Sequence, residues 1–220
     1  MSRGHDAGTV YIVDDDPAVR DGLSLLLRSA GFTIRAFASG SDFITAEREA
    51  GPGCVLLDLR MPGMDGMAVQ AELAEQDSNL PVIFLTAHGQ IQIAVTAVQR
   101  GAAGFLEKPN FDHDDMLEQI RTAIDGHRVA LEQLRRQSDL LDRIARLTVR
   151  ERQVALLAAA GKANKVIGSE LGISERTVEV HRSRGMKKLE LRSVADLVRI
   201  EPELMATTPA AEDGNEYSGR

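Results

Sequence analysis

Acidic residues, a hydroxyl and a lysine stand at the ends of separate apolar runs in this sequence, and together they could carry out phosphoryl transfer. In chain order they are Asp14, Asp15, Asp16, Asp58, Thr86 and Lys108. Carboxylates held close together repel one another, and a divalent cation that prefers oxygen ligands, Mg²⁺ or Mn²⁺, relieves this repulsion. Such an ion can bridge phosphate oxygens while an ammonium and a hydroxyl hold the others, so that an aspartate acts as the nucleophile.

Each of these residues also has a simpler interpretation. An acidic triplet before a helix often caps that helix and complements its dipole, and a lysine before a proline, as in Lys108-Pro109, is usually solvated. The chemical interpretation requires a fold that brings the ends of the apolar runs into one crevice.

Short apolar runs alternate with amphipathic stretches from Thr9 to Lys108. The predicted strands are Val10–Val13, Ile34–Phe37, Cys54–Asp58, Val82–Leu85 and Gly104–Leu106, and the predicted helices are Pro17–Ala30, Ser41–Glu49, Gly66–Gln76 and Gln90–Arg100. This alternation predicts an α/β domain, a doubly wound parallel five-stranded sheet with helices on both faces. In such sheets the functional crevice lies at the C-terminal ends of the strands, which is where the chemical residues stand.

Four segments, VDDDP, LLDLRMPGMDG, FLTAHG and GAAGFLEKP, follow one another at the predicted strand ends. In this order they resemble the receiver domain of two-component response regulators, over roughly residues 9–125. The resemblance implies a flavodoxin-like sheet with Asp58 as the phosphoacceptor. It also implies Mg²⁺ ligands from Asp15, the Asp58 carboxylate and the backbone carbonyl of Arg60, with Asp14 acting nearby or through water.

The same resemblance implies roles for three further side chains: Lys108 would pair with the phosphoryl group, Thr86 would donate a hydrogen bond to it, and Phe105 would be an aromatic switch. One alternative is a degenerate receiver that binds a ligand instead of a phosphoryl group. Another is an aspartyl-phosphate phosphatase, but that class needs a second aspartate two residues after the nucleophile, where this chain has Arg60. We therefore expect no enzyme activity beyond the receiver's own phosphoryl transfer and dephosphorylation.

Residues 147–200 form a basic segment that is predicted to be entirely helical. They hold 11 Lys or Arg against 6 Asp or Glu, whereas residues 9–125 hold 8 against 18. An acidic half suits a cation site and a basic half suits a polyanion. Capping residues and glycines predict four helices: one from the capping box of Thr148 and Glu151 to Ala160, then Asn164–Leu171, Glu175 to about Leu189, and one capped by Ser193. Two helices across the tight turn Gly172-Ile173-Ser174, the second of them basic, are typical of a helix-turn-helix.

The motif TxRERxV…G…NKxI…LGIS…TVEVHR closely resembles the LuxR-type tetrahelical DNA-binding domain. With such a receiver it indicates the NarL/FixJ class, and the receiver segments favour FixJ. Helical spacing places Glu179, Val180 and Ser183 toward the DNA groove with Arg182 beside them, and it places Arg176, Thr177, His181, Lys187 and Lys188 toward phosphates. His181 could instead be a packing residue, and the two lysines could be merely solvated.

Two glycines, Gly168 and Gly185, stand where the LuxR-type family usually has Ala and Ile or Val. A glycine inside a helix costs about 1 kcal/mol relative to alanine. We therefore expect a recognition helix that is less rigid than usual, and weak DNA binding in the absence of dimerisation.

Helix-forming residues continue from Asp114 to about Arg146, with Gly126 as the one glycine. Apolar residues recur there at an a/d spacing, in the series Leu117, Ile120, Ile124, His127, Leu131, Leu134, Ser138, Leu141 and Ala145. The first of these should pack on the receiver's own sheet. The later leucines need another partner, either the DNA-binding domain or a second copy of the chain in a short coiled coil weakened by His127 and Ser138, and we favour the second copy.

These segments predict a phosphorylation-dependent transcription regulator. It would have a receiver over residues 9–125, a helical linker over 126–146 and a DNA-binding domain over 147–200, with disordered ends over 1–8 and 201–220. The expected partners are a sensor histidine kinase, double-stranded promoter DNA and a second copy of the chain when phosphorylated, with RNA polymerase a further candidate. No run of eighteen apolar residues occurs, and a single cysteine, Cys54, fits a buried thiol in the cytoplasm.

Overall fold

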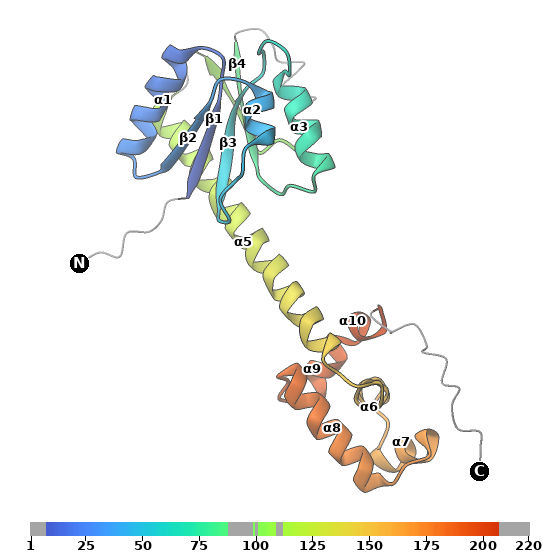
Figure 1. The fold of residues 1–220 in the computed structure, drawn as a ribbon. Coiled ribbons are helices and arrows are strands. Elements are labelled where there is room, and N and C mark those ends of the chain that lie inside the picture. Colours follow the sequence, from blue (N-terminus) through green and yellow to red (C-terminus); the bar gives the residue numbers. More distant parts are fainter. Residues whose placement is uncertain (1–7, 88–98, 100, 109–111, 207–220) are drawn as a thin grey trace. The chain divides into compact units, whose positions relative to one another are not determined.

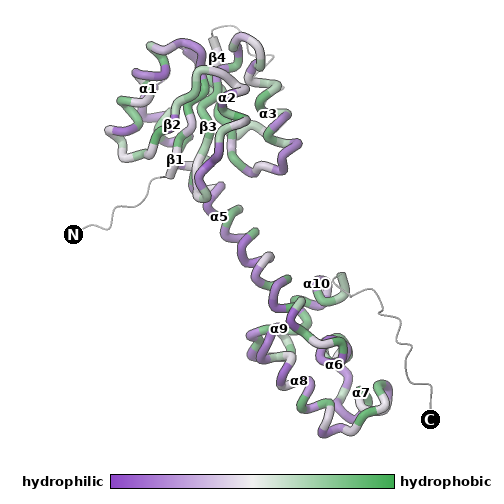
Figure 2. The backbone as a smooth tube through the Cα atoms, viewed as in Figure 1, coloured by the Kyte–Doolittle hydropathy of each residue, from purple (hydrophilic) through white to green (hydrophobic). Residues whose placement is uncertain are grey.

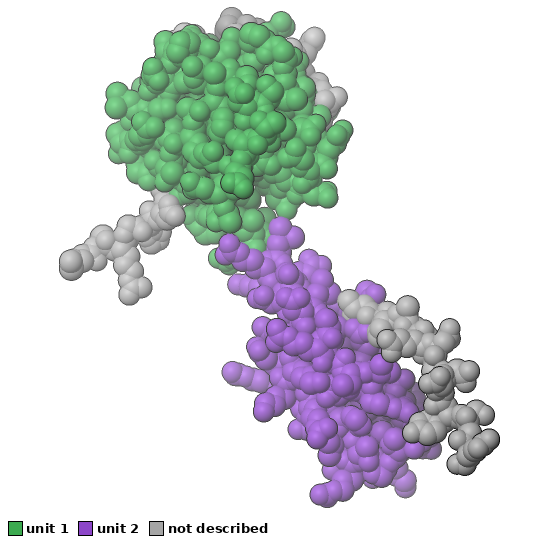
Figure 3. Space-filling view, in the orientation of Figure 1, with its two compact units in different colours: residues 1–133 green, residues 134–220 purple. Residues whose placement is uncertain are grey.

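The computed structural model describes residues 8–87, 99, 101–108 and 112–206. The chain divides into two compact units, residues 1–133 and residues 134–220 (Figure 3). Each unit has its own hydrophobic core, and they are described in turn. None of the described helices is long and apolar enough to cross a membrane.

The first unit is built on a parallel five-stranded sheet in the order β2-β1-β3-β4-β5. Its strands are β1 (Thr9–Val13), β2 (Thr33–Phe37), β3 (Gly53–Asp58), β4 (Val82–Ala87) and β5 (Gly104–Lys108). All five predicted strands are confirmed. The last one is two residues longer than predicted, because its ladder with β4 continues to the pair Ala87 and Lys108.

Helices cover both faces of this sheet (Figure 1). They are α1 (Pro17–Ser29), α2 (Gly40–Thr45), α3 (Gly66–Glu75) and the start of α5 (His113–Ala145). Helix α2 ends four residues before the predicted Glu49, because the backbone turns extended at Ala46. Tertiary hydrogen bonds hold the residues that follow, since Arg35 donates to the Glu47 carbonyl and the Tyr11 hydroxyl accepts from the Glu49 N–H at 3.2 Å. The predicted helix Gln90–Arg100 falls largely outside the described residues.

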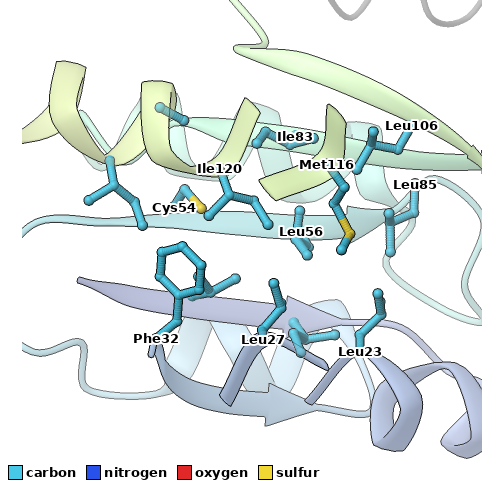
Figure 4. Packing of buried hydrophobic residues seen from close by; sticks show 14 residues of the cluster. Leu23, Leu27, Phe32, Cys54, Leu56, Ile83, Leu85, Leu106, Met116 and Ile120 are labelled. Atoms are coloured by element: carbon cyan, nitrogen blue, oxygen red, sulfur yellow. The ribbon is translucent and has the colours of Figure 1, made fainter. Parts of the chain in front are cut away.

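Successive side chains of each strand point to opposite faces of the sheet and pack into two core layers, as expected for strands buried on both faces. One layer packs Leu23 and Leu27 of α1 and Ile120 of α5 on strand residues such as Cys54 (Figure 4). The other packs α2 and α3 on the opposite face. In Figure 2 the strands are mainly hydrophobic, whereas the surrounding helices alternate between hydrophilic and hydrophobic residues. Cys54 is fully buried as predicted, and burial raises the pKa of its thiol to about 12.

Helix α5 is a single helix of 33 residues that Gly126 does not interrupt, as predicted. Its first half packs on the sheet of unit 1, while Ile144, near its end, is only 1% exposed and belongs to the core of unit 2. His127 is also buried against the sheet, so the expectation that it lies in a coiled-coil seam is wrong. The part of α5 outside both cores is therefore shorter than the predicted linker.

The second unit consists of short helices around one core. They are α6 (Val149–Ala159), α7 (Asn164–Leu171), α8 (Glu175–Leu189), α9 (Val194–Arg199) and α10 (Glu201–Ala206). The four predicted helices are confirmed, including the capping box of Thr148 and Glu151 and the caps at Ser174 and Ser193.

The prediction of a disordered chain beyond Ile200 is wrong for Glu201–Ala206, which form α10. Pro202 is the second residue of this helix, and the first turn of a helix tolerates proline. Leu204 supplies the reason for the helix, because its side chain is completely buried in the unit 2 core. Residues 207–220 lie outside the described part of the chain.

Candidate functional site

The C-terminal ends of the middle strands bring three aspartates together. Val13 of β1 pairs with Leu57 of β3, so the residues that follow, Asp14 and Asp58, are neighbours across the sheet. One carboxylate oxygen from each of Asp14, Asp15 and Asp58 lies within 4.8 Å of the others. This cluster was predicted from the sequence, and its donor set consists of oxygen atoms alone, which fits Mg²⁺ or Mn²⁺.

Lys108 enters the same cluster from the edge strand β5. Its ammonium lies 2.5 Å from Asp14 Oδ2 and 3.1 Å from Asp58 Oδ1. Burial disfavours the ammonium, but the hydrogen bond to Asp14 and the charges of both carboxylates outweigh burial and raise the pKa of Lys108. Burial raises the pKa of Asp58 above its ordinary value, although Lys108 opposes this. The site thus holds a fixed cation beside a carboxylate whose negative charge is poorly solvated.

The backbone fixes the orientation of the buried Asp14. Its Oδ1 accepts a hydrogen bond from the Asp16 N–H at 2.9 Å, and Arg20 donates to its carbonyl at 2.6 Å. Asp16 itself accepts from the Ala18 N–H at 2.9 Å and caps α1. The simple capping interpretation therefore holds for Asp16, whereas Asp14 and Asp15 are placed at the cluster.

Two of the three other predicted residues, Thr86 and Arg60, are neighbours of Asp58, whereas Phe105 lies on the edge strand β5. Thr86, 6% exposed, follows the β4 residue that pairs with Asp58. The Arg60 backbone N–H donates a hydrogen bond to the Asp58 carboxylate. Phe105 projects from β5 with 45% of its surface exposed. Asp14, Asp15, Asp58, Thr86 and Lys108 are thus at the C-terminal ends of the strands, while Phe105 lies three residues before the end of β5.

In unit 2, a hollow on the surface of α8 brings together side chains that were predicted to face DNA. It is lined by Arg176, Glu179, Val180, Ser183 and Arg184. Val180 is 41% exposed although it is apolar. Arg184 was not among the predicted residues. Its spacing of four residues from Val180 and eight from Arg176 was the signal that could have identified it.

Comparison with known proteins shows two family matches and full-length relatives. Residues 10–121 match the response regulator receiver domain, and residues 145–200 match the bacterial regulatory proteins of the luxR family. The transcriptional regulatory protein FixJ of Bradyrhizobium diazoefficiens is 40% identical, over 88% of this chain and 94% of that protein. The chain belongs to the FixJ-type response regulators.

Other relatives support the same family. The response regulator protein TmoT of Ectopseudomonas mendocina is 43% identical, over 89% of this chain and 88% of that protein. The solved structure of the response regulator StyR is 43% identical with a TM-score of 0.81, covering 89% of this chain and 98% of that one. Full-length FixJ from B. japonicum, at 38% identity, has a TM-score of 0.55 over 94% of this chain and all of that one. This FixJ-type chain therefore has the receiver and the LuxR-type domain of a transcriptional regulator.

Some residues predicted to contact DNA have partners within the LuxR-type domain. Arg182 donates to the Asn164 side chain at 2.9 Å and so ties α8 to α7. The Lys188 ammonium lies 2.6 Å from Glu151 Oε2, in a carboxylate that is almost fully buried, and donates to the Arg146 carbonyl at 3.1 Å. Lys188 therefore lies at the junction of α5, α6 and α8, where internal partners hold its ammonium. Thr177, His181 and Lys187 also belong to α8, and Lys187 is exposed.

The two unusual glycines have different surroundings. A Cβ atom on Gly168 would lie 2.7 Å from the Ile173 carbonyl oxygen, so glycine allows the turn of this helix-turn-helix to approach α7 closely. A Cβ atom on Gly185 would meet Glu151 and Leu147 at 3.6–3.9 Å, which is ordinary packing. The close approach of the turn thus requires glycine at position 168, whereas packing does not require glycine at position 185.

Proposed function

We propose that this regulator accepts a phosphoryl group on Asp58 from a sensor histidine kinase and that phosphorylation controls its binding to promoter DNA. The observation that carries the proposal is the cluster of Asp14, Asp15 and Asp58, with carboxylate oxygens within 4.8 Å of one another and Lys108 at 3.1 Å from Asp58. Phosphorylation replaces the poorly solvated charge of the Asp58 carboxylate with the charge of the phosphoryl oxygens. A bound cation and Lys108 can neutralise that charge.

In the proposed transfer, an Asp58 carboxylate oxygen bonds to phosphorus while the phosphorus–nitrogen bond of a phosphohistidine breaks. The other ring nitrogen of that phosphohistidine carries a proton taken from solvent, so the leaving group is neutral imidazole. Asp14, Asp15 and Asp58, with the Arg60 carbonyl, would hold Mg²⁺ or Mn²⁺, which supplies charge neutralisation when bound. Lys108 exchanges its contact with Asp58 for a phosphoryl oxygen, and Thr86 donates its hydroxyl hydrogen to another. Phe105, which is 45% exposed, would be the aromatic switch.

Chemical phosphorylation tests this assignment. Acetyl phosphate with Mg²⁺ should add the mass of one phosphoryl group to the full chain, and Asp58→Asn should abolish the addition. Asp16→Asn is the matched control, because Asp16 caps α1 and should not be required. Labelling of the Asp58→Asn protein, or full labelling in excess EDTA, would contradict the proposal.

We further propose that α8 enters the major groove of DNA. Glu179, Val180 and Ser183 would contact base edges with Arg182 beside them, and Arg176, Thr177, His181, Lys187 and the added Arg184 would contact phosphates or flank the groove. Base contacts specify sequence, whereas phosphate contacts supply affinity that falls with salt. The basic domain and its exposed hollow support this division.

Mutants of α8 separate the two kinds of contact. Arg176→Ala should weaken binding to all DNA alike and reduce the salt slope by about one unit. Glu179→Ala or Ser183→Ala should instead change the preferred site, at about 1–3 kcal/mol for each disturbed base contact. If selection from random DNA gave the same site for all three proteins, the proposed orientation of α8 would be incorrect.

We propose that the phosphorylated protein acts as a homodimer in the cytoplasm, with RNA polymerase as a further partner. The exposed leucines of α5 support pairing, since Leu134 is 47% exposed and Leu141 is 36% exposed. Pairing must begin beyond His127, because the receiver's own sheet covers this face of the helix up to that residue.

A further inference from the structure

A buried imidazole joins the strand of the phosphoacceptor to helix α5. Strand β3 begins at Gly53 and ends at Asp58. His127 Nδ1 lies 3.0 Å from both the backbone nitrogen and the carbonyl oxygen of Gly53, 74 residues away in the sequence. The imidazole is only 8% exposed. One end of β3 therefore carries the chemistry and the other end holds the helix that leads to the DNA-binding domain.

His127 occupies the point at which α5 leaves the receiver core. Ala123, Ile124 and His127 are buried, whereas Val129 is 56% exposed. Beside the imidazole, Gly126 is exposed, and a Cβ atom there would have nothing within 4 Å. Packing therefore does not hold the helix at Gly126, and the hydrogen bond one residue later fixes it to the sheet.

The chemistry of this contact depends on the position of one nitrogen. A neutral ring with its lone pair on Nδ1 accepts the Gly53 N–H, and the other tautomer donates to the Gly53 carbonyl. Either contact needs a polar atom two bonds from Cβ. A side chain of similar size without that atom fills the space but does not hold the strand.

We propose that His127 is a positioning residue that couples Asp58 to the linker helix, and this rests on the proposed control of DNA binding by phosphorylation. In this proposal β3, which is buried along its whole length and paired with β1 and β4, passes a displacement at Asp58 to Gly53 at its other end. The hydrogen bond from Gly53 to His127 passes it on to the first turn of α5 outside the core. Without this bond the receiver still becomes phosphorylated, but α5 no longer responds to it.

The test compares three variants of the full chain. In His127→Asn the side-chain amide replaces Nδ1, in His127→Gln it lies one bond farther from the backbone, and in His127→Leu no polar atom remains. Each protein is measured for phosphoryl uptake by mass after acetyl phosphate and Mg²⁺ treatment. Its affinity for a DNA fragment that the wild-type protein selected from a random pool is then measured with and without that treatment.

Phosphorylation of the wild type should raise its affinity for this DNA by a factor in the range of roughly 5 to 150. The Asn variant should keep this gain, while the Gln and Leu variants should take up phosphoryl groups normally and gain less than about twofold. A full gain in the Leu variant would overturn the proposal. If Leu prevented folding, equal gains in Asn and Gln would overturn it. A wild type that gains nothing would instead contradict the proposed function.

Discussion

The Lys188 ammonium lies 2.6 Å from the Glu151 carboxylate, which is 4% exposed, and this ion pair fastens the recognition helix to the start of α6. The Glu151 carboxylate also accepts the Thr148 backbone N–H at 2.8 Å and closes the capping box. Burial alone would raise the pKa of Glu151, but these hydrogen bonds outweigh burial and lower it. Lys188, which the sequence suggested as a DNA contact, thus connects two helices within the domain.

Lys188→Ala should destabilise the DNA-binding domain by about 1–3 kcal/mol, because it leaves a buried carboxylate without its charged partner. Lys187→Ala, the adjacent exposed lysine, should change stability by less than about 0.5 kcal/mol. Urea denaturation of both variants measures the difference. Equal stability of the two would mean that the ion pair contributes nothing to the fold.

The two unusual glycines should respond in opposite ways to alanine. Gly185→Ala should stabilise the domain by up to about 1 kcal/mol, because alanine favours the helix and its methyl group meets neighbours at ordinary distances. Gly168→Ala should destabilise the domain, because its methyl group would meet a backbone oxygen at 2.7 Å. Thermal unfolding checks both signs, and a stabilising Gly168→Ala would contradict the close approach of the turn.

Divalent cations should stabilise the receiver through the aspartate cluster. At a Mg²⁺ concentration about 100 times its dissociation constant, the free energy of unfolding should rise by about 2.7 kcal/mol. Asp15→Asn should reduce this gain, since Asp15 belongs to the cluster. Asp16→Asn, a change in the helix cap, should preserve it. Calorimetry with and without EDTA gives the measurement, and equal gains in both variants would exclude Asp15 as a ligand.

His127 should make stability depend on pH. Burial lowers the pKa of this imidazole below 6.5, although the hydrogen bond to Gly53 opposes the shift. At a pH between the lowered pKa of the folded chain and the ordinary pKa of the unfolded chain, the unfolded chain binds a proton that the folded chain does not. The free energy of unfolding therefore falls as pH falls below 6.5. His127 also lines a surface pocket together with the acidic residues Asp115 and Glu118, which are the charged groups that face the imidazole there.

His127→Asn should weaken this pH dependence. The comparison is the difference in unfolding free energy between about pH 7.5 and about pH 5.5, for the wild type and the variant. The wild type should lose more stability than the Asn variant on acidification. The same loss in both proteins would mean that the imidazole titrates alike in the folded and unfolded chains.

The exposed leucines of α5 should contribute to the dimer proposed for the phosphorylated protein. Replacing Leu131 and Leu134 together by Asp places two carboxylates on the proposed contact and should weaken dimerisation by about tenfold or more. Val129→Asp is the control, because Val129 is 56% exposed and lies off the a/d stripe. Sedimentation of the phosphorylated proteins decides the matter, and an unchanged dimer mass for the double variant would mean that α5 does not pair.

The sequence by itself determined the order of strands and helices along the chain and which acidic and basic residues lie together at the strand ends. Strand ends in a parallel sheet meet at one edge, so Asp14, Asp58 and Lys108 could be placed together without coordinates. The capping box at Thr148 was equally clear, because its two hydrogen bonds are local. These features depend on the residues near them in the chain, or on a rule that holds for the whole fold class.

Only the tertiary structure decided the contacts between distant segments. Helix α2 ended early because Tyr11 and Arg35 bind the loop that follows it, and Leu204 made a helix because a core was present to receive it. Lys188 found Glu151, 37 residues away, and His127 found Gly53, 74 residues away. In the sequence, a lysine on a basic helix looks the same whether it contacts DNA or an internal carboxylate. A histidine in an apolar stripe likewise looks the same whether it lies in a coiled coil or binds an internal backbone group. The difference between these roles is the free energy of burying a polar group with its partner, and that partner is known only when the chain is folded.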